Sequence, residues 1–328
     1  MINSELNQFL RDYKIKAYCC DIKENPLSRI YDFSLLPGAK VKSLEKFSSE
    51  ITMFLREFSE PTIQIVYQQN IVRFEYLKNN RPPIDFFSNA CNYNNSHPLN
   101  CYIGNSLSND PIFVNIADAP HMLVAGSTGS GKSTLLNVLI SNLLRNNIRT
   151  SLIDLKGVDF FEYNRFRNFN IASSYDDAYS LIKLYINQMN LLYSNIISGK
   201  IKKENIYPSV IIIDEFADLI MQDFSGEFKN NLLKLIQKCR AVSIHVIIAT
   251  QRPSVKIIDG NIKANIPVRI ACKTSSGIDS RVILDESGAE KLIGRGDSLM
   301  RDAQGNFIRF QSAYTTPEDA IKNLILNK

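Results

Sequence analysis

Apolar residues in the first part of the chain return at steps of three and four. This spacing in residues 41–58 predicts one helix with a single buried face. The apolar positions of that face are Val41, Leu44, Phe47, Ile51, Leu55 and Phe58. Strand-like stretches flank the helix at residues 29–35, 62–67 and 71–77. We therefore expect a small α+β domain over residues 1–95, ending in a linker made of Arg81-Pro82-Pro83 and an Asn-rich patch at 89–95.

From residue 96 to residue 328 the pattern changes. Short β-branched apolar runs alternate with helical stretches, and a final helical stretch covers residues 317–326. Such runs are typical of buried parallel strands, so the alternation predicts an α/β domain with helices on both faces of its sheet. The runs are residues 122–124, 150–153, 210–213, 246–248 and 268–271.

The overall composition agrees with a folded chain of about two domains. The chain has 328 residues, 45% hydrophobic and 22% charged, which excludes a disordered or fibrous protein. No apolar run reaches the roughly 18 residues of a membrane span, and the polar N-terminus lacks a secretory signal. The six cysteines form no CxxC pair, and with three histidines they show no zinc spacing. We expect reduced thiols, a cytoplasmic location and no direct insertion into a membrane.

A phosphate-binding motif opens the second region. Residues 126–133 are GSTGSGKS and fit GxxxxGK[ST] in full, between a strand-like run at 121–125 and a helical stretch at 134–144. Glycines there let backbone N–H groups surround a phosphate at the helix N-terminus. Lys132 is expected to reach the β- and γ-phosphates of ATP, and the Ser133 hydroxyl to bind Mg²⁺. The expected ATP contacts are Gly126, Ser127, Thr128, Gly129, Ser130, Gly131, Lys132, Ser133 and Thr134.

Two later strand ends carry polar groups that would complete an ATPase site. The run 210–213 ends in Asp214, which is expected to hold the metal, and Glu215, which is expected to deprotonate the attacking water. A pair of solvated acids is the alternative for these two residues. The run 243–249 leads to Gln251, whose amide would sense the γ-phosphate; an ordinary turn at a strand end is the alternative there.

Longer motifs resemble the FtsK/SpoIIIE family of DNA translocases. They are PHMLVAGSTGSG at 120–131, AVSIHVIIATQRPSV at 241–255, GNIKANIPVRIA at 260–271, IDSRVILD at 278–285 and EKLIGRGD at 290–297. The resemblance extends from about residue 100 to residue 311. It is weaker at YDF (31–33) and LPGAKV (36–41), which are similar to the family's small α domain. Two residues depart from the family's pattern: Leu155 stands where proline is frequent, and Arg295 where methionine is usual.

The resemblance implies a RecA-like P-loop domain that works in a ring, typically a hexamer, and pumps double-stranded DNA on ATP hydrolysis. The roles that it assigns fall on Lys132 and Ser133 (Walker A), Asp214 and Glu215 (Walker B) and Gln251 (sensor). Arg281 would be an arginine finger for the neighbouring subunit, with a surface salt bridge as the alternative. Family members typically also carry a membrane span and a DNA-reading domain. The chain therefore resembles the motor alone, and partner proteins would supply membrane attachment or DNA recognition.

Basic residues are concentrated in one segment. The net charge of the chain is only +5, but residues 229–281 hold ten basic and two acidic side chains. A motor that grips DNA needs cations facing the phosphates, whereas solvated helix faces are the alternative explanation. The expected DNA contacts are Arg252, Lys256, Lys263, Arg295 and Arg301, which lie in loops beyond the sensor.

Three other functions remain open from the sequence. Similar modules serve as secretion ATPases that handle proteins, and others move DNA in conjugation or viral packaging. A nucleotide switch without motor activity is the third, and the carboxylate of Glu215 argues against it. The rate of ATP hydrolysis with and without duplex DNA separates a DNA motor from a protein-handling ATPase.

Overall fold

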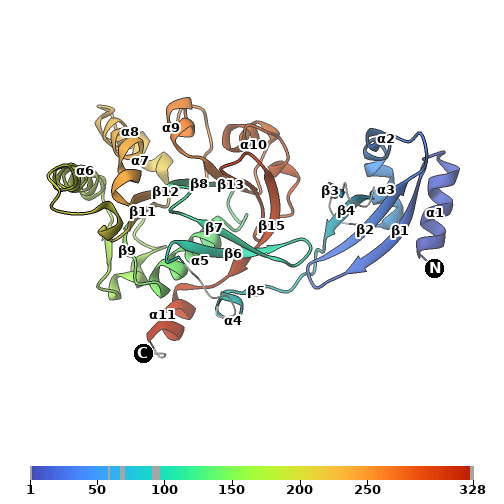
Figure 1. The fold of residues 1–328 in the computed structure, drawn as a ribbon, viewed down its shortest axis with the longest axis horizontal. Coiled ribbons are helices and arrows are strands. Elements are labelled where there is room, and N and C mark those ends of the chain that lie inside the picture. Colours follow the sequence, from blue (N-terminus) through green and yellow to red (C-terminus); the bar gives the residue numbers. More distant parts are fainter. Residues whose placement is uncertain (1, 58–59, 67–70, 91–96, 326–328) are drawn as a thin grey trace. The chain divides into compact units, whose positions relative to one another are not determined.

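The computed structural model describes residues 2–57, 60–66, 71–90 and 97–325 (Figure 1). The chain divides into two compact units: residues 1–83 with 105–111, and residues 84–104 with 112–328. The domain boundary expected near residue 95 stays a prediction. Phe58, Tyr67, Leu326 and most of the Asn-rich patch lie outside the described residues. None of the helices in the described part of the chain could span a membrane.

The first unit contains a four-stranded antiparallel sheet. Its strand order is β1 (Ala17–Glu24), β2 (Ser28–Leu35), β4 (Ile71–Leu77) and β3 (Thr62–Val66). Helix α1 (Ile2–Asp12) buries Leu6 and Leu10 in the same core, because residues four apart lie on one face of a helix. The small α+β unit is present as expected, but its first helix and first strand were not predicted.

The single helix expected over residues 41–58 was wrong. The structure has two short helices, α2 (Val41–Lys46) and α3 (Ser48–Leu55), which meet at Phe47. The backbone of Phe47 leaves the helical region there (φ −99°, ψ 15°). Leu44 and Ile51 are nevertheless buried in one core, so the apolar spacing identified the buried face correctly and missed only the break.

The second unit is built on a large, mostly parallel sheet. Six neighbouring strands run parallel in the order β10 (Phe169–Ala172), β9 (Arg149–Ile153), β11 (Ser209–Ile213), β12 (Ile244–Thr250), β8 (His121–Ala125) and β13 (Val268–Cys272). Next come β14 (Asp297–Arg301) and β15 (Phe307–Tyr314), both antiparallel to their predecessors, then β6 (Asn100–Ser106) and β7 (Pro111–Asn115). A short strand, β5 (Ile84–Asp85), pairs with β15 and is followed by α4 (Phe86–Ala90). All five predicted apolar runs are strands of this sheet.

Helices cover both faces of the large sheet (Figure 1). One core contains α6 (Tyr175–Ile197), α7 (Phe216–Gln222), α8 (Glu227–Lys238), α9 (Gly260–Asn265) and α10 (Gly277–Leu284). The other core contains α5 (Lys132–Arg145) and α11 (Pro317–Ile325). In β8, Leu123 belongs to the first core and Val124 to the second, as the two-residue period of a strand requires. The predicted α/β fold is confirmed.

Two buried histidines stand near the amino ends of β8 and β12. His121 is 1% exposed, and its Nδ1 accepts a hydrogen bond from the Val246 amide at 3.1 Å, which requires a neutral ring. His245 is 2% exposed, and its Nδ1 lies 3.2 Å from the Pro120 carbonyl oxygen, to which it donates. Burial lowers the pKa of His121 to about 3 and the pKa of His245 to about 4.

We expect these two histidines to make the fold sensitive to mild acid. Below about pH 6.5 the unfolded chain takes up two protons that the folded chain does not. The free energy of unfolding should therefore fall by up to about 2.7 kcal/mol per pH unit between about pH 6 and pH 4. Urea unfolding at pH 7, 6 and 5 measures this slope. The His245→Asn variant should lose about half of it, and an unchanged slope in that variant would contradict the assignment.

Candidate nucleotide site

The predicted phosphate loop connects the carboxyl end of β8 to the first turn of α5. It is fastened on two sides. The backbone N–H and the hydroxyl of Ser127 donate to the Lys273 carbonyl oxygen at 2.8 and 3.0 Å, and the Gly296 amide donates to the Ser130 carbonyl oxygen at 2.9 Å. Gly131 has a φ of +108°, and a Cβ there would lie 2.5 Å from the Gly296 nitrogen. This close approach allows only glycine at position 131.

Lys132 and Asp214 form a buried ion pair. The Lys132 Nζ lies 2.7 Å from the Asp214 Oδ1 and 3.0 Å from the Asp214 carbonyl oxygen. Their side chains are 3% and 2% exposed. The two residues are far apart in sequence, but β8 and β11 end at the same edge of the parallel sheet. The charge of the Lys132 ammonium group is thus neutralised by the Asp214 carboxylate.

Glu215 is held by the end of the neighbouring strand β12. Its Oε1 accepts a hydrogen bond from the Thr250 hydroxyl at 2.5 Å, and its Oε2 accepts one from the Gln251 amide at 2.9 Å. The side-chain Oε1 of Gln251 in turn accepts a hydrogen bond from the Thr128 hydroxyl at 2.8 Å. The expected base and the expected sensor are therefore adjacent, and the sensor already contacts the phosphate loop.

A cluster of three carboxylates lies beside this pair, and sequence reasoning found only one of its members. Asp154, Asp159 and Asp214 each offer an oxygen within 4.8 Å of the others. Asp154 is 2% exposed and accepts hydrogen bonds from four backbone amides of the loop 156–160. Partial burial, and then the charges of Asp214 and Asp154, raise the pKa of Asp159 above its usual value. The missed signal is that Asp154 follows β9 just as Asp214 follows the adjacent β11.

The oxygen ligands at this edge suit a divalent metal. Mg²⁺ prefers hydroxyl and carboxylate oxygens together with waters and substrate phosphates. Ser133 lies in the first turn of α5, and Asp214 follows β11, whose carboxyl end lies at the same edge of the sheet as that of β8. The chemistry of these donors fits the expected ion.

Comparisons with known proteins agree with this geometry. A profile of the FtsK/SpoIIIE family matches residues 85–194 and 163–255. The DNA translocase FtsK of Haemophilus influenzae is 30% identical over 97% of this chain, and the DNA translocase SftA of Bacillus subtilis is 29% identical over 96%. The chain belongs to the FtsK/SpoIIIE family. It spans 69% of the length of the first relative and 35% of the second.

Solved structures extend the FtsK/SpoIIIE assignment to the fold. The conjugation coupling protein TcpA of pCW3, solved as a monomer with ATPγS, superposes with a TM-score of 0.70 over 99% of both chains at 22% identity. The cytoplasmic domain of the type VII secretion ATPase EccC of Thermomonospora curvata gives 0.64 over 74% of this chain and 34% of its own, also at 22% identity. The predicted RecA-like P-loop ATPase fold is therefore confirmed.

Arg281 is exposed on α10. Among the described residues it makes no ion pair, so the surface salt bridge considered as the alternative is not present there. Ile278, one turn earlier, is 66% exposed. An uncovered apolar side chain and a cation without an ion pair among the described residues therefore lie one turn apart on this helix.

The five expected DNA contacts do not form one surface. Arg252 and Lys256 are exposed after the carboxyl end of β12, whereas Arg295 lies between the two glycines that pack beside the phosphate loop. Lys263 and Arg301 converge instead on one carboxylate, that of Asp285, at 2.6 and 3.3 Å.

The carboxylate of Asp285 forms a small ionic cluster. The buried Arg269 also pairs with it at 2.7 Å, and donates to the carbonyl oxygen of Ile283 at 3.1 Å. Partial burial acts to raise the pKa of Asp285, but hydrogen bonds from Lys263 and Arg269 outweigh it and lower that pKa below its usual value. The cluster joins α9, β13 and β14 to the end of α10, the helix that carries Arg281.

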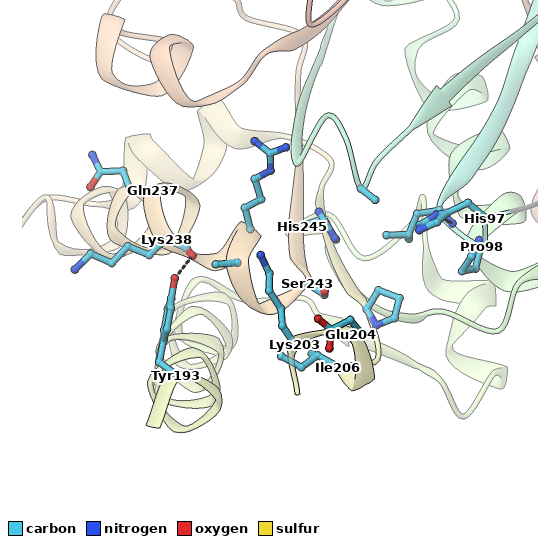
Figure 2. A pocket seen from close by; sticks show the side chains of 15 residues that line it. His97, Pro98, Tyr193, Lys203, Glu204, Ile206, Gln237, Lys238, Ser243 and His245 are labelled. Atoms are coloured by element: carbon cyan, nitrogen blue, oxygen red, sulfur yellow. Dashed lines mark hydrogen bonds between the residues drawn. The ribbon is translucent and has the colours of Figure 1, made fainter. Parts of the chain in front are cut away.

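Part of the basic segment faces the opposite edge of the sheet. A cavity of about 760 Å³ lies near the amino ends of β11 and β12, and Lys238 and Arg240 of this segment line it. Lys203, which precedes the segment, also lines it; Lys203 and Lys238 are labelled in Figure 2. The Tyr193 hydroxyl donates to the Lys238 carbonyl oxygen at 2.7 Å beside it (Figure 2). The ten basic residues of 229–281 are thus distributed over both edges of the sheet. The excess of positive charge in this segment of the sequence therefore does not form one positively charged face.

Proposed function

We propose that the chain is an ATP-hydrolysing motor that translocates double-stranded DNA as part of an oligomeric ring. The observation that carries this proposal is the hydrogen-bonded carboxylate of Glu215 beside a complete phosphate loop, because a positioned base supports hydrolysis rather than slow switching. Relatives that are named DNA translocases match nearly the whole chain and supply the substrate class. These relatives are longer than this chain, so the translocase activity of the full-length relatives is proposed for this chain and is not shown for it.

The proposed mechanism assigns one task to each residue. ATP draws Lys132 away from Asp214, and its ammonium group pairs with the β- and γ-phosphates. Glu215 takes a proton from the attacking water, whose oxygen bonds to the γ-phosphorus while the bond to the bridging β–γ oxygen breaks. Gln251 orients that water or the γ-phosphate. Ser133 and Asp214 would hold Mg²⁺, which neutralises phosphate charge when it is bound.

A neighbouring subunit would complete the site. In a head-to-tail ring each ATP lies at an interface, and Arg281 of one subunit would neutralise transition-state charge in the next. The proposed assembly is a cytoplasmic homo-hexamer that encloses the duplex, with other proteins providing membrane attachment or DNA recognition. The exposed Ile278 and Arg281 on α10 support this interface.

The rate of ATP hydrolysis with and without duplex DNA tests the proposed function. Several-fold stimulation by DNA supports the motor, whether the DNA is a chromosome or a mobile element. If DNA left the rate of ATP hydrolysis unchanged and a polypeptide substrate raised it, the result would support a secretion ATPase instead. A directional assay, in which the protein displaces a triplex-forming strand from the duplex, separates translocation from mere binding.

Lys256 should contribute to DNA affinity through phosphate contact. It is exposed, close to the sensor strand, and has no ion-pair partner among the described residues. We expect Lys256→Ala to weaken duplex binding by about threefold and to reduce the slope of log K against log salt by about one. Lys203→Ala, at the opposite edge of the sheet (Figure 2), is the matched control and should change neither quantity. Equal effects of the two substitutions would argue against a DNA-facing edge.

A further inference from the structure

Arg295 lies at the nucleotide site although it comes far after the phosphate loop in the sequence. The segment 294–296 packs directly on that loop. The Gly296 amide donates to the Ser130 carbonyl oxygen, and a Cβ on Gly294 would contact the Gly129 carbonyl oxygen at 3.8 Å. Consecutive Cα atoms are 3.8 Å apart, so the side chain of Arg295 begins beside the wall of the phosphate cradle.

The backbone around Arg295 is held in place from three sides. Its own carbonyl oxygen accepts a hydrogen bond from the Gln311 side chain at 2.9 Å, and the Gly296 carbonyl oxygen accepts one from the Ser312 amide at 2.8 Å. The next residue, Asp297, is fully buried and paired with Arg309 at 2.8 Å. Arg295 has a φ of +53°, a left-handed conformation that this packing maintains. The loop therefore presents one long exposed cation from a rigid base.

The order of the strands shows which end of the nucleotide this cation can meet. Asp214, Glu215 and Gln251 follow β11 and β12, on one side of the phosphate-loop strand β8. Arg295 precedes β14, which lies beyond β13 on the other side of β8. The proposed mechanism places the γ-phosphate among the first group. The α-phosphate and the nucleoside would then lie on the side of the loop that Arg295 occupies.

We propose that Arg295 binds the nucleotide of its own subunit, at the α-phosphate and nucleoside end, and does not contact DNA. A planar guanidinium can pair with phosphate oxygens and can also stack on a base. This inference rests on the proposed ATP-driven function, but it concerns binding alone. It gives a role to the one position of the loop that departs from the methionine usual in the family.

Equilibrium binding of ADP to the full chain tests the proposal without any turnover. ADP carries the α-phosphate and nucleoside but lacks the γ-phosphate. We expect Arg295→Met to weaken ADP binding by about tenfold and to leave the affinity for duplex DNA unchanged. Arg295→Gly, which suits the left-handed backbone and keeps the loop conformation, should weaken ADP binding equally. Arg252→Met, the matched control from the proposed DNA edge, should show the opposite pattern.

The outcomes separate this proposal from the general function. Unchanged ADP affinity in both Arg295 variants, at an unchanged melting temperature, would overturn the nucleotide role. If the Arg295 variants lost affinity for DNA but not for ADP, the proposal would also be overturned, and Arg295 would be a DNA contact instead. A wild-type chain that binds ADP but does not respond to DNA would contradict the motor function, while the ADP comparison would still decide the role of Arg295.

Discussion

Replacing Lys132 by alanine is expected to abolish ATP hydrolysis and also to lower the free energy of unfolding by about 3–5 kcal/mol. The first effect follows from the loss of the cation that binds the β- and γ-phosphates. The second follows from the buried pair, because the Asp214 side chain, only 2% exposed, would lose its partner at 2.7 Å. ATPase assays and urea unfolding of the same preparation measure the two effects.

The double variant Lys132→Ala with Asp214→Asn is the control that separates catalysis from stability. Removing both charges leaves the net charge of the carboxylate cluster unchanged, so most of the lost stability should return while hydrolysis stays absent. A Lys132→Ala protein as stable as the wild type would show that the pair contributes nothing to folding. Normal turnover in that variant would contradict the assigned phosphate site.

Replacing Glu215 by glutamine should lower kcat by about 10²–10⁴-fold and leave nucleotide binding intact. Glutamine has the same shape, and a carbonyl oxygen at the Oε1 position can still accept from the Thr250 hydroxyl at 2.5 Å and from the Gln251 amide at 3.2 Å. The substitution removes the ability to take a proton, together with the 2.9 Å hydrogen bond that the Gln251 amide donates to Oε2. Single-turnover hydrolysis and equilibrium binding of ATP measure the two properties.

Glu204→Gln is the matched control for this substitution, since Glu204 lines the cavity at the opposite edge of the sheet. It should keep the wild-type rate. If Glu215→Gln retained a kcat within about threefold of the wild type, another group would have to act as the base, and the mechanism would be wrong.

Local motifs predicted where the phosphate-loop motif lies in the fold, between β8 and α5. The phosphate loop is continuous in sequence, so the positions of Lys132 and Ser133 follow from eight neighbouring residues. The strand ends at Asp214 and Gln251 were also predicted, because parallel strands place their carboxyl ends at one edge. The partner of each side chain was not predicted. Nothing in the spacing indicates that Lys132 pairs with Asp214 or that Gln251 contacts Thr128.

Features that depend on long-range packing were missed. The role of Gly296 is visible only when the phosphate loop and the β14 strand are side by side. Counting charges along residues 229–281 could not reveal that Lys263 and Arg269 share the carboxylate of Asp285, nor that Arg240 faces the other edge. The helix breaks at Phe47 through a change in backbone dihedral angles. The spacing of apolar residues does not indicate this break, because both helices bury the same face.

The hydrogen bonds that link the phosphate loop to β12 have an energetic consequence. Lys132 pairs with Asp214, and Thr128 donates a hydrogen bond to Gln251, so a bound nucleotide would have to exchange these internal contacts for its own. The free energy of breaking the internal contacts is subtracted from the apparent affinity for the nucleotide. That affinity is therefore set by the difference between the two sets of contacts and not by the phosphate contacts alone.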